Sequence, residues 1–172
     1  MTPDLRQVLA SRARALQDRL NRFSVGSVEA ATEARCIFED ADDDVRCRWL
    51  ALELVGYAEH VDARALHQVL DVPPGDRLAA HVAAYRAQRG FDVTSDHNRA
   101  EFRHFFIEPL SDLEAARVRV ASVAASTLVL DFGRHPRDAR YPRAAEFSRA
   151  VFDRVVAGFM AALHLQLGTL AA

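Results

Sequence analysis

Ser111-Asp112-Leu113-Glu114 opens the stretch that decides the predicted fold, SDLEAARVRVASVAASTLVLDFG over residues 111–133. A serine followed three residues later by a glutamate is the pattern of a capping box. In that motif each side chain accepts a hydrogen bond from the backbone N–H of the other residue at the start of a helix. The apolar run continues to Gly133, a residue typical of the position just after a helix end. The stretch therefore predicts one long helix.

Similar start and stop signals recur along the rest of the chain. Apolar residues at helical spacing, bounded by Ser, Asp, Pro or Gly, predict most of the chain to be helical. We therefore predict a single all-α domain, residues 1–172, with about seven helices packed as an irregular bundle. The further helical segments are predicted at 3–23, 27–38, 45–55, 62–70, 76–89, 95–107 and from Pro142 onward. The predicted core centres on Trp49, Leu52, Phe105, Leu128, Val155 and Phe159.

Composition narrows the class of protein. The chain has 172 residues, is 50% hydrophobic and 27% charged, and carries a formal net charge of −2. All 22 basic residues are arginine, and a near-neutral balance lacks the basic footprint of nucleic-acid binding. No uninterrupted apolar run of about 18 residues predicts a membrane span. The N-terminal residues lack a signal-peptide pattern, so the expected location is the cytoplasm.

Cys36 and Cys47 are too few for a disulfide scaffold in a chain of this length. Their separation fits no zinc-site spacing, and their apolar neighbours predict two small core residues.

Three residues suggest a metal site. His97, Glu101 and His104 stand at i, i+4 and i+7, so in a helix they would share one face. Glu-x-x-His is half of the di-iron motif of helical bundles, and Glu53 or Glu59 from a neighbouring helix would complete a site for iron, zinc or manganese. A second Glu-x-x-His is absent from the sequence. A helical-bundle metalloprotein is therefore the alternative interpretation, and the leading one has no cofactor.

Arginines recur at every third residue of one predicted loop, which also holds an aromatic neighbour, Tyr141. Such a cluster can bind an acidic or phosphorylated partner, whereas the structural alternative is a solvated loop whose arginines pair with nearby acids. The predicted partner-binding residues are Arg134, Arg137, Arg140 and Arg143.

Two other patterns have simpler structural explanations. Asp40 to Asp44 resembles the first half of a calcium loop, but Val45 and Ala51 stand where that loop needs Gly and Glu. Acidic residues before a helix also cap it, which is the interpretation we favour. A helix-turn-helix over residues 66–86 is disfavoured by its alanines, by two prolines in the turn and by the negative net charge.

Residues 27–57 carry a family resemblance. Ser27-Val28-Glu29-Ala30-Ala31, an acidic turn, and Trp49-Leu50-Ala51-Leu52-Glu53-Leu54-Val55-Gly56-Tyr57 follow one another, with Tyr85-Arg86 and Gly90 downstream. This order resembles the start of AbiTii-type abortive-infection domains. Val55 departs from the family, which usually has a polar residue there, and the spacer to Tyr85 is longer. The resemblance covers about the first half of the chain and implies a bacterial phage-defence context, with no catalytic residues to carry over.

The same segment also has a physical interpretation as a packing unit. Trp49, Leu52 and Val55 are expected to face inward. Gly56 is expected to permit close approach of another helix, and Tyr57 to close the apolar face. Glu53 lies within this apolar helix, so it needs a cationic partner, for which Arg86 or Arg89 is the candidate.

The sequence holds no Gly-rich phosphate loop, nucleophile elbow or His-Glu-x-x-His helix. We therefore expect a non-enzymatic interaction or regulatory protein with a protein partner. The segment from Phe147 to Leu167 is apolar on more than one face, which predicts a homodimer through this helix. Phe152 and Met160 are expected in that interface.

Overall fold

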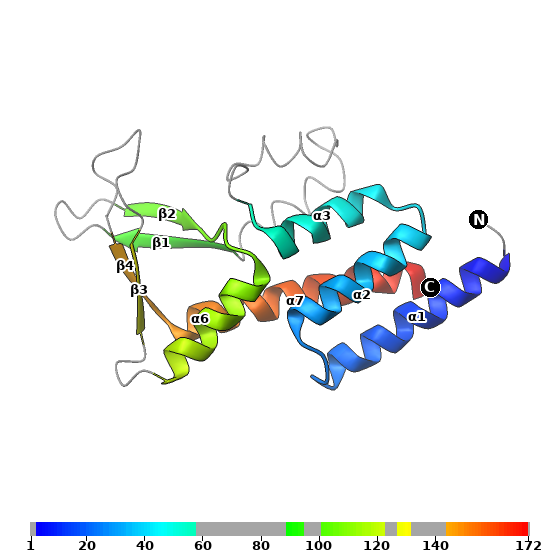
Figure 1. The fold of residues 1–172 in the computed structure, drawn as a ribbon, viewed down its shortest axis with the longest axis horizontal. Helices are drawn as coiled ribbons and strands as arrows, with labels where there is room; N and C mark the ends of the chain where they lie inside the picture. Colours follow the sequence, from blue (N-terminus) through cyan, green and yellow to red (C-terminus); the bar gives the residue numbers. More distant parts are fainter. Residues whose placement is uncertain (1–2, 58–88, 95–100, 123–126, 132–143, 172) are drawn as a thin grey trace.

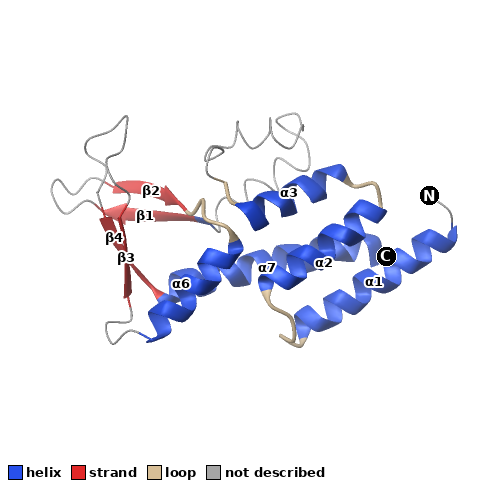
Figure 2. Ribbon diagram, viewed as in Figure 1, coloured by secondary structure: helices blue, strands red, loops and turns tan. Residues whose placement is uncertain are grey.

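The computed structural model describes residues 3–57, 89–94, 101–122, 127–131 and 144–171, and this part of the chain is predominantly helical, as predicted (Figures 1 and 2). The segments predicted at 62–70 and 76–88 lie outside it, so the predicted helix count of seven and the complete bundle are not tested. Helices and strands follow in the order α1 (Pro3–Asn21), α2 (Ser27–Asp40), α3 (Asp44–Val55), β1 (Gly90–Thr94), β2 (Glu101–Phe105), α6 (Leu110–Ser122), β3 (Thr127–Asp131), β4 (Ala144–Ser148) and α7 (Arg149–Ala171).

The larger core lies among α1, α2, α3 and α7. The last helix runs alongside α1, although the two are at opposite ends of the sequence (Figure 1). Fully buried side chains from all four helices meet there, among them Leu16, Phe38, Leu50 and Phe159. The Trp49 ring lies 5.8 Å from the Phe159 ring, so two of the predicted core residues are in contact.

The structure has four short strands, and three of them, β2, β3 and β4, lie where the sequence predicted helix. β1 pairs antiparallel with β2, with Gly90 opposite Phe105, and β3 pairs antiparallel with β4, with Thr127 opposite Ser148. The helix predicted over 95–107 is therefore wrong at 101–105. The helix predicted to run to Gly133 ends at Ser122, and the last helix begins at Arg149 instead of Pro142. Backbone hydrogen bonds between consecutive strands override the local helical spacing. Thr, Val and Phe also favour strands.

A smaller core lies between α6, α7 and the strands. It contains Leu113 and Val120 of α6, Val155 and Val156 of α7, and an aromatic trio whose members are Phe106, Phe147 and Phe152. The ring centroids of Phe106 and Phe147 are 5.0 Å apart, and those of Phe106 and Phe152 are 5.6 Å apart.

The two cores together account for the buried apolar residues along the length of α7. Phe152 is only 1% exposed, so its predicted place in a homodimer interface is wrong. The first part of α7 packs into the smaller core through Phe152, Val155 and Val156, and the second part packs into the larger core through Phe159, Leu163 and Leu167. This apolar content does not by itself require a partner.

The length and apolar composition of α7 also satisfy the criteria for a membrane span. A helix that crosses the core of a soluble protein passes the same test. Here Phe159, Leu163 and Leu167 of α7 are fully buried against other helices of the chain.

Gly56 ends α3 with a left-handed φ of 105°. A Cβ atom at this position would lie 2.9 Å from the carbonyl oxygen of Ile107, so the residue must be glycine for the two segments to touch. A close approach at Gly56 is present, but the prediction that the neighbour is another helix is wrong, because Gly56 meets Ile107 and Pro109 of the segment before α6. Tyr57 is buried as expected, whereas Val55 is 80% exposed and does not face inward.

Candidate functional site

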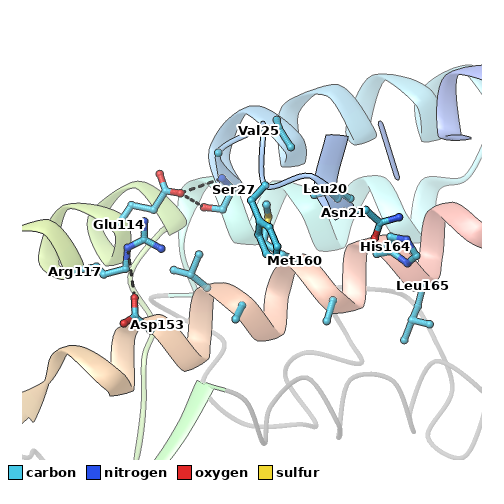
Figure 3. A pocket seen from close by; sticks show the side chains of 15 residues that line it. Leu20, Asn21, Val25, Ser27, Glu114, Arg117, Asp153, Met160, His164 and Leu165 are labelled. Carbon is cyan, nitrogen blue, oxygen red and sulfur yellow. Dashed lines mark hydrogen bonds and ion pairs between the residues drawn. The ribbon is translucent and has the colours of Figure 1, made fainter. Parts of the chain in front are cut away.

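A groove of about 740 Å³ lies between the α1–α2 turn, α6 and α7 (Figure 3). Its apolar lining comes from Leu20 and Val25 on one side and from α7 on the other, where Ala157 and Ala161 leave room between Val156 and Leu165. Met160 and His164 lie along the same stretch of α7 in Figure 3. The groove is therefore an apolar surface depression with polar groups at its ends.

Charged side chains in the groove bind neighbours within the chain. The Glu114 carboxylate of α6 accepts hydrogen bonds from the backbone N–H of Ser27 at 3.0 Å and from its hydroxyl at 2.7 Å. Arg117 lies 3.7 Å from Asp153, as Figure 3 shows. Polar groups that are already paired within the chain add little affinity for a charged ligand. A ligand of this groove would therefore bind mainly through the exposed apolar surface.

The Glu114 contact also corrects the predicted capping box. α6 begins at Leu110, the Ser111 hydroxyl lies 3.3 Å from Asp112, and Glu114 bonds α2 instead of the start of its own helix. A carboxylate at a helix N-terminus satisfies free N–H groups and complements the helix dipole whichever helix supplies it. By contrast, the predicted capping role of the acidic run is confirmed, because Asp43 accepts from the Arg46 N–H at 3.0 Å at the start of α3.

Phe23 is the most exposed large apolar residue of the described chain and lines the groove. It is 91% exposed, and it follows α1 with a left-handed φ of 52°. The Phe23 N–H donates to the Leu20 carbonyl at 3.1 Å and the Ser24 N–H to the Arg19 carbonyl at 3.0 Å. This pair of bonds is the Schellman motif, and Phe23 occupies the position where glycine is usual.

A buried polar cluster joins α3 to the β1–β2 pair. The Arg89 guanidinium donates to the Glu53 carboxylate at 2.8 Å and to the carbonyls of Phe106 and Glu108 at 2.7 Å. It also lies 4.9 Å from the Tyr57 ring centroid, and the Tyr57 hydroxyl donates to Glu53. The predicted pairing of Glu53 with an arginine is thereby confirmed for Arg89.

Burial dominates the electrostatics of this cluster. Desolvation raises the pKa of Glu53, although the charge of Arg89 and hydrogen bonds from neighbouring side chains act in the opposite direction. Desolvation and the adjacent Glu53 charge raise the pKa of Tyr57 well above its ordinary value. All three side chains are closed off from solvent, so the cluster stabilises the fold and offers no access to a ligand.

The described residues do not test the predicted metal site as a whole. His97 lies outside the described residues, and Glu101 and His104 belong to β2, so the shared helix face on which the prediction depended is wrong. Within the described ranges, no group of three His, Cys, Asp or Glu residues could hold a metal ion. Metal binding by these residues stays a prediction.

The arginine cluster is not tested either. The predicted partner-binding residues, namely Arg134, Arg137, Arg140 and Arg143, all lie outside the described residues. None of the predicted metal-binding or arginine-cluster residues lines the groove, whereas Met160, which the sequence predicted for a dimer interface, does. The sequence did not identify Phe23 as a binding residue, because the helix predicted over 3–23 includes it. An aromatic residue just before Ser24-Val25-Gly26-Ser27, where the helix must end, was the available signal.

Comparisons of the chain with protein families, with curated proteins and with solved structures found no match.

Proposed function

We propose that this chain is a non-enzymatic helical interaction protein that binds a protein partner through the groove between the α1–α2 turn, α6 and α7. The observation that carries the proposal is Phe23, which is 91% exposed on the wall of this groove. Exposed aromatic side chains beside an apolar depression are typical of protein interfaces, in which a few aromatic anchors supply most of the binding energy.

Leu165 supports the same assignment. It is 69% exposed and lines the groove from α7. Phe23 and Leu165, two large apolar side chains, therefore border the same groove. The charged groups of the groove are paired with other residues of the chain. This arrangement resembles a protein interface, which has an apolar centre and a polar rim.

A photo-crosslinking amino acid at position 161 tests the proposal. Ala161 lines the groove and is exposed, so the substitution leaves both cores intact. We expect a protein adduct on irradiation of cells that express this variant. The matched control carries the same group at Val118, which is exposed on α6 and does not line the groove, and gives no specific adduct. Equal labelling at both positions, or none at position 161, would contradict the proposal.

The defence context is the second part of the proposal and rests on the resemblance of residues 27–57 to abortive-infection domains. Expression in a bacterial host is expected to reduce phage plaque formation, and Ala161→Arg is expected to remove that protection. A host equally sensitive with and without the protein, for a broad set of phages, would argue against this part alone.

A further inference from the structure

We propose that the occupant of the groove is a second copy of this chain, with Phe23 of each copy inserted into the groove of the other. This inference rests on the proposed function and names the partner. The homodimer predicted from the sequence relied on Phe152 and Met160, of which Phe152 is buried and Met160 lines the groove. The present proposal relies on Phe23 and Leu165, both exposed on the groove walls.

Backbone geometry is the first reason to regard Phe23 as an anchor. A bulky residue with left-handed φ is disfavoured by contact between Cβ and the carbonyl oxygen, and Gly or Asn usually fills this position of the Schellman motif. Phe23 regains little of that free energy inside its own chain, because it is 91% exposed. Such an outlier indicates that the side chain acts outside the fold of one chain.

Symmetry is the second reason. The anchor and the depression lie on the same face of one chain, so a two-fold axis can bring each Phe23 to the groove of the other copy. Ala157 and Ala161 are exposed on the groove wall and leave space for an incoming ring. A different partner would need its own cavity for Phe23, whereas a second copy already has one.

Area and charge are compatible with this occupant. Two buried Phe side chains contribute about 300–500 Å². A stable interface needs about 1,200–2,000 Å² in total, so Leu165 and the groove walls of both copies must supply the remainder. Repulsion between copies is small at a net charge of −2, and Asp153 in the groove already has Arg117 at 3.7 Å and Arg149 at 3.3 Å.

Light scattering behind size exclusion tests the dimer with two variants. Phe23→Asn removes the ring and keeps a residue that tolerates left-handed φ, and Ala161→Arg fills the groove of an otherwise unchanged chain. The wild-type chain is expected to approach twice its 19.1 kDa mass at about 100 µM. Each variant alone is expected to weaken self-association at least about thirtyfold. Val118→Ser, which removes an exposed apolar residue outside the groove, is expected to behave as wild type.

Mixing the two variants tests the reciprocal geometry. In a mixed dimer the intact Phe23 of the Ala161→Arg copy meets the open groove of the Phe23→Asn copy, so one of the two contacts is restored. We therefore expect mixed dimers under conditions in which either variant alone is monomeric. A wild-type mass of 19.1 kDa at every concentration, or no association in the mixture, would overturn the inference.

The crosslink at position 161 separates this inference from the proposed function. An adduct of twice the chain mass supports both. An adduct of a different mass keeps the proposed function and overturns the second copy as the occupant. The absence of any adduct overturns the proposed function itself.

Discussion

Phe23 shows how a single residue can oppose the stability of its own chain. The end of α1 needs a left-handed residue after Arg22, and the backbone bonds of Phe23 and Ser24 form the motif that glycine usually completes. A phenylalanine there strains the backbone and exposes an apolar ring. Both effects destabilise the free chain. In our proposal, burial of the ring in the groove of a second copy compensates for them.

Phe23→Gly is therefore expected to stabilise the free chain. Glycine relieves the strain of the left-handed backbone, and this effect outweighs the added flexibility of the unfolded state. The free energy of unfolding is expected to increase by about 0.5–1 kcal/mol. Urea unfolding at low micromolar concentration, where self-association contributes little, measures the difference. Phe23→Ala keeps a Cβ atom in the strained conformation and is expected to lie within about 0.5 kcal/mol of wild type. Loss of stability in Phe23→Gly would contradict the assigned strain.

Tyr57 is expected to make stability fall at alkaline pH. Its folded pKa is raised well above the ordinary value near 10, because burial and the charge of Glu53 oppose its ionisation. A group with a raised folded pKa contributes stability that is complete below the unfolded pKa and is lost as the pH rises above it. The free energy of unfolding should therefore decline above about pH 10.

Ultraviolet absorbance of tyrosinate checks this expectation. One of the three tyrosines is expected to ionise only as the chain unfolds, and Tyr57→Phe is expected to remove that component. Free ionisation of all three tyrosines in the folded chain would show that Tyr57 is accessible.

At the scale of helices and strands, Glu114 connects two helices that the sequence treats separately. Its carboxylate accepts from both the N–H and the hydroxyl of Ser27, so α6 supplies the N-terminal cap of α2. The residue before α2, Gly26, has no side chain that could do so. The start of α2 therefore depends on the position of α6.

Glu114→Ala is expected to cost about 0.5–2 kcal/mol of unfolding free energy, the usual range for loss of an N-terminal cap. Ser111→Ala is the matched control, because a capping box would make it equally costly, whereas the observed contacts predict less than about 0.5 kcal/mol. Chemical denaturation of the two variants decides between these arrangements. A larger loss of unfolding free energy in Ser111→Ala than in Glu114→Ala would support the capping box instead.

Across the whole molecule, the pair of Glu53 and Arg89 joins the larger helical core to the strands. Glu53 lies on α3, while Arg89 directly precedes β1 and binds carbonyls of the segment that leads into α6. The two residues are 36 positions apart, so one buried ion pair holds together two parts that are distant in sequence.

Glu53→Ala is expected to cost about 3–5 kcal/mol, because it leaves the buried charge of Arg89 without this counter-charge. Glu39→Ala is the control, since its pair with Arg35 on the surface of α2 is about half exposed and is expected to contribute less than about 1 kcal/mol. Thermal and urea unfolding measure both variants. Equal costs for the two would show that Glu53 is hydrated.

The sequence by itself determined α1, α2 and α3, because each has its apolar spacing and its end signals within a single segment. It also indicated the pairing of Glu53, because a carboxylate on a buried helix face requires a cation. The tertiary structure alone decided the four strands, since each is stabilised by backbone hydrogen bonds to a partner strand and not by bonds within its own segment. It also decided that Glu114 caps α2 instead of α6, and that the α1–α2 turn, α6 and α7 enclose a groove. These features depend on which surfaces meet, and local propensity carries no information about that.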